Sequence, residues 1–129
     1  MVKPDGVRRG LVGEVLGRIE RKGYRITRLE MRAVDVDLSR QHYAEHTEKP
    51  FYGELEEFIT SGPVVAMVVE GPGVVETVRA MMGPTNPLSA PAGTLRGDFG
   101  TVITENIVHG SDSPESAERE IEIWFGRTG

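Results

Sequence analysis

The sequence predicts an α/β (α+β) sandwich in which helices cover one β-sheet. Two observations support this prediction: apolar residues recur with helical spacing in several segments, and strand-like segments alternate with these helices. A third observation is the apolar run PVVAMVVEG, residues 63–71, which is typical of a strand covered on both faces. No internal repeat or linker is visible, so we expect one domain over residues 1–129.

The first third of the chain predicts a very short strand, a turn, a helix and a second strand. The Pro-Asp-Gly sequence at residues 4–6 is typical of a turn, which leaves only residues 1–2 as a strand before it. Apolar residues at helical spacing predict a helix over residues 11–22, and Gly23 suits the position just after its end. Alternation at residues 24–34 then predicts a half-exposed strand.

The middle of the chain predicts two short helices, over residues 38–47 and 53–61, which are separated near Pro50. The apolar strand at 63–71 follows them. Residues 73–83 then predict a further helix, because their apolar positions have helical spacing and a glycine closes the segment.

The last third predicts a loop, a strand and a final helix. Residues 84–100 are rich in proline and glycine, and loops of this length in a compact domain are often functional. Residues 101–109 predict a strand that is broken or bent near Glu105 and Asn106. The last helix is expected to begin at Pro114, with Asp112 or Ser113 as its N-cap.

The composition limits the classes of function. The chain has no cysteine, which excludes disulfides and thiolate metal sites. No apolar run approaches the roughly 18 residues of a membrane span and no signal-peptide pattern is visible, so we expect a cytoplasmic enzyme or binding protein without a membrane contact. The net charge of −5 argues against a dedicated nucleic-acid binder, although a local group of arginines could still hold a small phosphate ligand.

His109 is the most informative candidate for chemistry. On its spacing alone, a strand-end histidine held by a backbone partner explains it slightly better than a catalytic one. Gly110 would let a backbone segment or a ligand approach closely, and Ser111 supplies a hydroxyl beside the imidazole. Glu118 or Glu120 of the following helix could turn back to one ring nitrogen, which would fix the tautomer and leave the other nitrogen free to attack.

The other two histidines are better explained as surface residues than as metal ligands. His42 and His46 are spaced i, i+4 on a predicted helix, an arrangement that can bind a metal. No third ligand is evident and polar residues surround them, so we favour solvated helix residues.

Three cationic residues could bind phosphate. Lys3, Arg79 and Arg96 are each best explained singly as surface charges, but beside a nucleophilic histidine they would form a phosphate clamp. The sequence has no Gly-x-x-x-x-Gly-Lys loop, so a bound phosphate would have to be held by side chains and a metal ion.

Taken in order, the motifs resemble those of the nucleoside diphosphate kinase family. The segments that carry the resemblance are VKPDGV, SGPVVAMVVEG, TNP, GTLRGDF, NIVHGSDS and SAEREIEIWF, which run from residue 2 to about residue 125. The resemblance implies a ferredoxin-like fold with a four-stranded antiparallel sheet. It also implies transfer of the γ-phosphate of a nucleoside triphosphate to a nucleoside diphosphate, by a ping-pong scheme through a phosphohistidine at His109, with broad base specificity.

The resemblance also implies a role for each matching residue. Catalysis would use His109, with Glu120 and Ser111 supporting the imidazole and Tyr43 beside it. Mg²⁺ would be the cofactor, with Asp112 reaching it through water. The nucleotide would be bound by Lys3 (phosphates and sugar), Phe51 (base), Arg79, Thr85 and Arg96 (phosphates) and Asn106 (ribose 3′-hydroxyl).

The chain departs from the family pattern at its first strand, which is shortened because Met1 lies inside it. Such a gap would leave backbone groups of two neighbouring strands unpaired. We expect further residues before Met1 in the natural protein; a different segment in the gap and a shorter, less stable strand are the alternatives. The resemblance further implies a homo-oligomer, with a hexamer favoured over a tetramer and a subunit contact near Pro87. The alternative functions are a nucleotide- or nucleic-acid-binding regulator without turnover and a phosphohistidine carrier to a protein.

Overall fold

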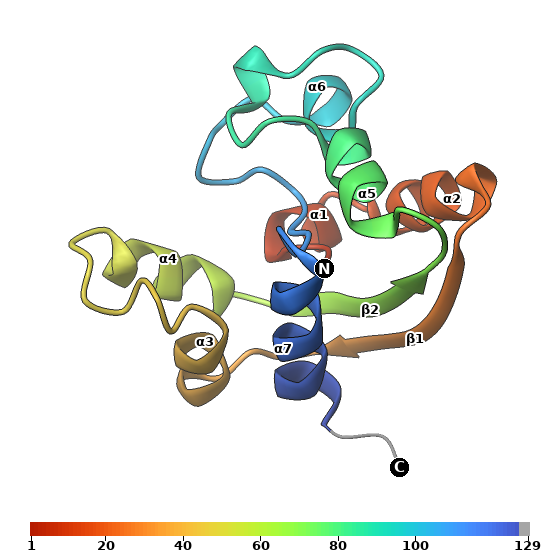
Figure 1. The fold of residues 1–129 in the computed structure, drawn as a ribbon. Helices are drawn as coiled ribbons and strands as arrows, with labels where there is room; N and C mark the ends of the chain where they lie inside the picture. Colours follow the sequence, from red (N-terminus) through yellow and green to blue (C-terminus); the bar gives the residue numbers. More distant parts are fainter. Residues whose placement is uncertain (127–129) are drawn as a thin grey trace.

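The computed structural model describes residues 1–126. Figure 1 shows two strands side by side, with α3 and α4 near one end of them, α2 and α5 near the other, and α7 crossing between. In chain order the elements are α1 (Pro4–Arg8), α2 (Val12–Lys22), β1 (Arg25–Arg32), α3 (Val36–His42), α4 (Tyr52–Ile59), β2 (Val64–Glu70), α5 (Val74–Met82), the 3₁₀ helix η1 (Pro87–Ser89), α6 (Leu95–Phe99) and α7 (Pro114–Phe125).

The antiparallel sheet is smaller than the expected four strands. Within residues 1–126, β1 and β2 are its two strands, paired from Arg25 opposite Glu70 to Arg32 opposite Val64. Val2 extends the sheet by single-residue antiparallel bridges, to Val65 on one side and to Val108 on the other. The prediction of four strands is therefore wrong, because α1 begins at Pro4 and only the residues before it pair with both neighbours.

β2 is covered on both faces, as the apolar run predicts. Val65 belongs to one buried cluster with Ile19 of α2, whereas Val64 and Ala66 belong to a second cluster with Trp124 of α7. Neighbouring side chains of a strand point to opposite faces, so this split shows that helices cover both sides of the strand. Its second half is less well covered, since residues 67–69 are only partly buried.

Residues 101–109 do not form the expected strand. They contain only isolated bridges, between Val102 and Glu105 and at Val108. Ile107 explains the interruption, because its φ of 76° lies in the left-handed region, which a β-branched residue rarely adopts. The fully buried Ile107 is held there by Asp5, whose Oδ2 accepts from its backbone N–H at 3.0 Å.

Two predicted irregular segments are helical. The turn at residues 4–6 is the start of α1, because a proline at the first helical position and an acidic residue in the first turn favour a helix as well as a turn. The loop at 84–100 contains η1 and α6. Thr94 caps α6 by accepting a hydrogen bond from the N–H of Gly97, a local signal that the proline-rich composition obscures.

The remaining helices agree with the periodicity, with shifts at their ends. α2 ends at Gly23 with a φ of 103°, the left-handed cap that glycine favours. α7 begins at Pro114 with Ser113 as its cap. α3 stops at His42 instead of residue 47. Within residues 1–126, no helix is both long and apolar enough to span a bilayer.

Candidate active site

His109 is fixed by the short N-terminal segment. Its N–H donates to the Met1 carbonyl at 2.9 Å, and the Met1 amino group donates to the His109 carbonyl at 2.9 Å. The two bridges of Val2 hold this pair against β2. The backbone around the histidine is therefore set by residues more than a hundred positions away in the chain.

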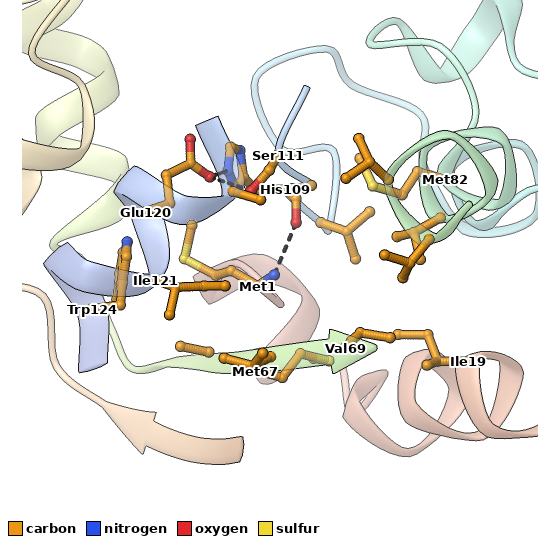
Figure 2. Close-up of a pocket in the computed structure, with 18 of the residues that line it drawn as sticks. Met1, Ile19, Met67, Val69, Met82, His109, Ser111, Glu120, Ile121 and Trp124 are labelled. Atoms are coloured by element: carbon orange, nitrogen blue, oxygen red, sulfur yellow. Dashed lines mark hydrogen bonds and ion pairs between the residues drawn. The ribbon is translucent and has the colours of Figure 1, made fainter. Parts of the chain in front are cut away.

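The imidazole of His109 is oriented by α7. Its Nε2 lies 2.8 Å from Glu120 Oε1, and Ser111 Oγ donates to the same oxygen at 2.7 Å. Ser111 thus supports the carboxylate and not the ring itself. Because a carboxylate is an acceptor only, Nε2 must carry the proton, which leaves Nδ1 with a free lone pair. Figure 2 shows Glu120 and Ser111 beside the ring.

The electrostatics of this pair favour a neutral imidazole next to a charged carboxylate. Burial works to raise the pKa of Glu120, but the hydrogen bond and charge of His109 and the hydrogen bond from Ser111 outweigh it and lower the pKa to about 2. The pKa of His109 is lowered, chiefly by burial, although the bond to Glu120 opposes the shift. A neutral imidazole with Nδ1 free can act as a nucleophile.

His42 is a site residue that the sequence reasoning missed. The prediction of a solvated helix residue is wrong: His42 is 5% exposed, and its ring packs edge-on against His109 with 4.6 Å between centroids. Its Nδ1 accepts from Trp124 Nε1 at 3.0 Å. Burial, followed by the nearby His109, lowers the pKa of His42 to about 3. The available signal was Leu38, which lies one helical turn earlier on the same apolar face of α3.

Two arginines lie beside the histidine. Arg96 is 7% exposed and donates to three carbonyls: Gly83 at 2.9 Å, Asn106 at 3.1 Å and Val108 at 2.7 Å. Arg79 donates to the Gly110 carbonyl at 2.9 Å. Burial and then the charge of Arg79 lower the pKa of Arg96, which is expected where two cations lie close without a counter-ion.

Lys3 and Asn106 link three segments of the chain. Lys3 Nζ donates to Asn106 Oδ1 at 2.7 Å, and Asn106 Nδ2 donates to the carbonyl of Thr85 at 3.0 Å. Burial, and secondly the charge of Arg96, lower the pKa of Lys3 to about 8. These contacts join the N-terminus, the segment after α5 and the segment before His109.

These side chains share a pocket of about 330 Å³, which we call the polar pocket. Its walls are mostly cationic or polar, as a site for a phosphate ligand requires. Among the predicted site residues, those that line it are Lys3, Tyr43, Arg79, Thr85, Arg96, Asn106, His109, Asp112 and Glu120.

The structure places two predicted residues, Tyr43 and Phe51, less centrally. Tyr43 lines the polar pocket, but its ring packs on His42, with 4.6 Å between centroids, and it is His42 that contacts His109. Phe51 is 50% exposed and lies outside the pocket wall, with its ring centroid 5.9 Å from that of His46.

Packing against α5 explains why a glycine stands at position 110. A Cβ atom there would lie 2.6 Å from Met82 Sδ, so the missing side chain makes room for α5. Asp112 is an exposed residue on the pocket wall. Its pKa is lowered, first by a hydrogen bond with Ser116 and then by the charge of Arg79.

Two groups could interact with a metal ion. Within residues 1–126, His42, His109 and Glu120 place their ligand atoms within 4.8 Å of one another. Mg²⁺ does not suit two imidazoles, because it prefers oxygen ligands. The carboxylate of Asp112, in a pocket with cationic walls, suits Mg²⁺ better, since this ion is usually held by one or two carboxylates together with substrate phosphates. Within residues 1–126, His46 does not belong to this group of three ligand atoms.

Known proteins resemble this chain along nearly its whole length. A model of the nucleoside diphosphate kinase family matches residues 1–129. A nucleoside diphosphate kinase of Thermus thermophilus is 62% identical over 97% of this chain and 91% of its own length. One from Brevibacillus brevis is 60% identical over 97% of this chain and 85% of its own. The solved structure of a halophilic nucleoside diphosphate kinase from Halobacterium salinarum in complex with CDP has a TM-score of 0.94 and 46% identity, covering 98% of this chain and 84% of that one.

Proposed function

The chain belongs to the nucleoside diphosphate kinase family, and from this premise we propose that His109 carries the phosphate between the two half-reactions. The enzyme transfers the γ-phosphate of a nucleoside triphosphate to a nucleoside diphosphate. The observation that carries the proposal is the 2.8 Å contact of His109 Nε2 with Glu120, which leaves Nδ1 as the free nucleophilic atom beside the cationic residues. The residues of the polar pocket do not favour the alternative of a binding protein without turnover.

Each half-reaction is a displacement at phosphorus. Nδ1 of His109 attacks the γ-phosphorus; a bond between nitrogen and phosphorus forms while the bond from phosphorus to the β–γ bridging oxygen breaks. The nucleoside diphosphate leaves with that oxygen. Positive charge develops on the ring, and the Glu120 carboxylate compensates it through the Nε2–H. A second diphosphate then attacks the phosphohistidine through its terminal oxygen and restores the free imidazole.

The pocket would hold the phosphates mainly by charge. Arg79 and Arg96 each keep N–H groups beyond those bound to carbonyls, and these would bind the β- and γ-phosphates together with Thr85. Lys3 would exchange its bond to Asn106 for a phosphate oxygen. Asp112 would hold Mg²⁺ through water; when bound, the ion would neutralise phosphate charge.

The nucleoside would be bound with little selectivity for its base. Phe51 would stack on the base, a contact that every base can make through its π face. Asn106 would bind the ribose 3′-hydroxyl through its amide. This arrangement supports broad base specificity, because no predicted contact reads the edge of the base.

The assembly and location are also proposals. We propose a cytoplasmic homo-oligomer, with a hexamer favoured over a tetramer. Leu88 of η1 is 78% exposed beside the buried Pro87, and this exposed apolar side chain supports a subunit contact at that loop. Sedimentation equilibrium measures the number of subunits directly. A monomer at micromolar concentration would contradict the proposal.

The test of the mechanism is a labelling experiment. Incubation with γ-labelled ATP and Mg²⁺ should give an acid-labile label on the protein, which added GDP removes as labelled GTP. His109→Ala should lose the label and the exchange activity while its circular dichroism stays unchanged. Arg9→Ala is the matched control, because Arg9 is exposed, its side chain donates to the Phe99 carbonyl at the surface, and it lines neither pocket. Label that persists in His109→Ala would refute the assignment.

A further inference from the structure

Arg119 is a cation on the wall of the polar pocket that the proposed reaction does not use. It lies on α7 one residue before Glu120, and its side chain is 42% exposed. Both terminal nitrogens of its guanidinium have partners: Nη1 donates to the Gln41 carbonyl and Nη2 to the His42 carbonyl, each at 3.1 Å. Arg119 therefore joins α7 to the end of α3, which lies beside it in Figure 1.

The two carbonyls lie where α3 stops supplying partners of its own. The last carbonyls of a helix have no intrahelical donor, so they need donors from elsewhere. At the end of α3, the Tyr43 N–H still donates to the Ser39 carbonyl at 2.9 Å. The carbonyls of Gln41 and His42 come later, and Arg119 supplies their donors. A cation also suits this end of a helix, where the backbone carbonyls carry partial negative charge.

The end of α3 carries two residues of the candidate site. His42 packs edge-on against the His109 ring, and the Tyr43 ring packs on His42, with 4.6 Å between centroids in both pairs. Tyr43 also lines the polar pocket. A displacement of this helix end would therefore move an aromatic contact of the nucleophile and one wall of the pocket together.

α7 carries the other parts of the same arrangement. Glu120 holds Nε2 of His109, and one turn later Trp124 Nε1 donates to His42 Nδ1 at 3.0 Å. Figure 2 shows Glu120 and Trp124 on this helix. The bond from Trp124 holds the ring of His42, whereas the two bonds of Arg119 hold the backbone of α3. A planar guanidinium that donates twice fixes direction as well as distance.

We propose that Arg119 is a positioning residue for phosphoryl transfer. By holding the C-terminal end of α3 against α7, it sets the contact of His42 with the His109 ring and the place of Tyr43 on the pocket wall. Because this role concerns the geometry of the nucleophile, it rests on the function proposed for His109. Displacements of about 1 Å that originate far from the chemistry can lower a rate on the order of 10²-fold. Arg119 acts through its neighbours and does not contact the nucleotide.

Kinetics of two variants and a control test this role. Arg119→Met removes both hydrogen bonds and keeps an aliphatic stem. With saturating γ-labelled ATP, its rate constant for phosphohistidine formation should fall about 10-fold, while the KM for nucleotide stays within about 2-fold. Arg119→Lys keeps the charge but not the fork, so it should remain about 3-fold below the parent rate. Arg21→Met is the matched control, because Arg21 is exposed on α2 and does not line the polar pocket.

Trp124 provides a readout that a loss of stability alone would not move. It is the only tryptophan of the chain, so its indole N–H gives a single signal in a proton–nitrogen NMR spectrum. In folded Arg119→Met the bond from Trp124 to His42 should weaken as the end of α3 shifts, and the signal should move towards that of a free indole. The signal of Arg21→Met should match that of the parent chain.

The two readouts decide the question together. An unchanged rate in Arg119→Met would overturn the proposal, and so would an unmoved Trp124 signal. A raised KM at an unchanged rate would also overturn it, because Arg119 would then bind the nucleotide itself.

Arg119→Lys decides if Arg119→Met does not fold. A rate equal to that of the parent chain would overturn the proposal, and a lower rate with an unchanged KM and a shifted Trp124 signal would support it. Failure of the proposed function would look different, because the label would then persist in His109→Ala while Arg119 is intact.

Discussion

The polar pocket and an apolar cavity of about 150 Å³ between β2, α5 and α7, which we call the strand slot, share His109 and Glu120 as a common wall, but they are built in opposite ways. On the polar side, directional hydrogen bonds fix each group: Arg96 binds three carbonyls and Asn106 joins Lys3 to Thr85. On the slot side, apolar side chains meet an edge of β2 that Val2 joins by a bridge to Val65.

This difference separates chemistry from stability. A pocket whose polar groups already have partners is preorganised, so a mutation there should lower the rate, and it should also lower the free energy of unfolding where it removes a bonded donor. Apolar side chains of the slot are partly exposed, and burying more apolar surface there would stabilise the fold. A mutation in the slot should therefore mainly change the free energy of unfolding. The predictions that follow test this division.

The largest effect is expected for Arg96→Ala. The variant should lower kcat/KM by about 10³-fold, because a cation aimed at the phosphates is lost. It should also lower the free energy of unfolding by about 3 kcal/mol, since three carbonyls lose their donor. Steady-state exchange and urea unfolding measure both values. Arg9→Ala should change neither strongly, and a stability loss without a rate loss would contradict the role at the pocket.

Glu120→Gln tests how the ring is held. The variant should lower kcat on the order of 10²-fold with little change in KM, because the amide keeps the shape but no longer compensates charge on the ring. Glu118→Gln, on the exposed part of the same helix, is the matched control. Equal exchange rates in the two variants would contradict the claim that Glu120 compensates charge on the ring through Nε2–H.

His42 gives a prediction in the pH dependence of stability. Its folded pKa of about 3 lies below its ordinary value of 6.5, so between these pH values the unfolded chain binds a proton that the folded chain does not. The free energy of unfolding therefore falls as the pH falls from 6.5, and by pH 5 this histidine alone accounts for roughly 2 kcal/mol.

The measurement compares variants that lack this titration. His42→Gln and His42→Phe should both lose about 2 kcal/mol less than the parent chain between pH 6.5 and 5. Phenylalanine should also cost about 1 kcal/mol at pH 7, because Trp124 Nε1 loses its acceptor. An unchanged slope of stability against pH in both variants would show that His42 is not the group responsible.

The smallest effect is expected on the slot side. Val78→Ile adds one methylene to the slot wall and should raise the free energy of unfolding by about 0.8 kcal/mol. Val36→Ile, at a position 47% exposed on α3, adds the same group to solvent and should change little. Thermal unfolding compares the two. Destabilisation by Val78→Ile would mean that the slot is already filled by its own side chains.

Local signals predicted much of this fold correctly. Periodicity and an end glycine were sufficient for α2, and a proline with a capping serine marked the start of α7. The errors lie where two local explanations compete. Pro, Asp and Gly at residues 4–6 suit both a turn and a helix start, and only packing against Val2 and Ile107 selects the helix.

The candidate site was less accessible to such signals. The residues alone allowed either Glu118 or Glu120 near His109, and the rotation of α7 about its axis selects Glu120. His42 was misread because its partners, Trp124 and His109, lie far away in the sequence. The left-handed Ile107, which interrupts the last predicted strand, has no local signal either, since nothing in its neighbours favours that conformation.

The sequence by itself determined the residue types, the order of the motifs, and the helices whose caps and periodicity are local. Only the tertiary structure decided which nitrogen of His109 is free, why His42 stays neutral, and how Val2 joins β2 to the segment of His109. The reason is physical: hydrogen bonds such as those between Met1 and His109 join groups far apart in the chain. Burial and directional contacts of that kind exist only after the elements have packed.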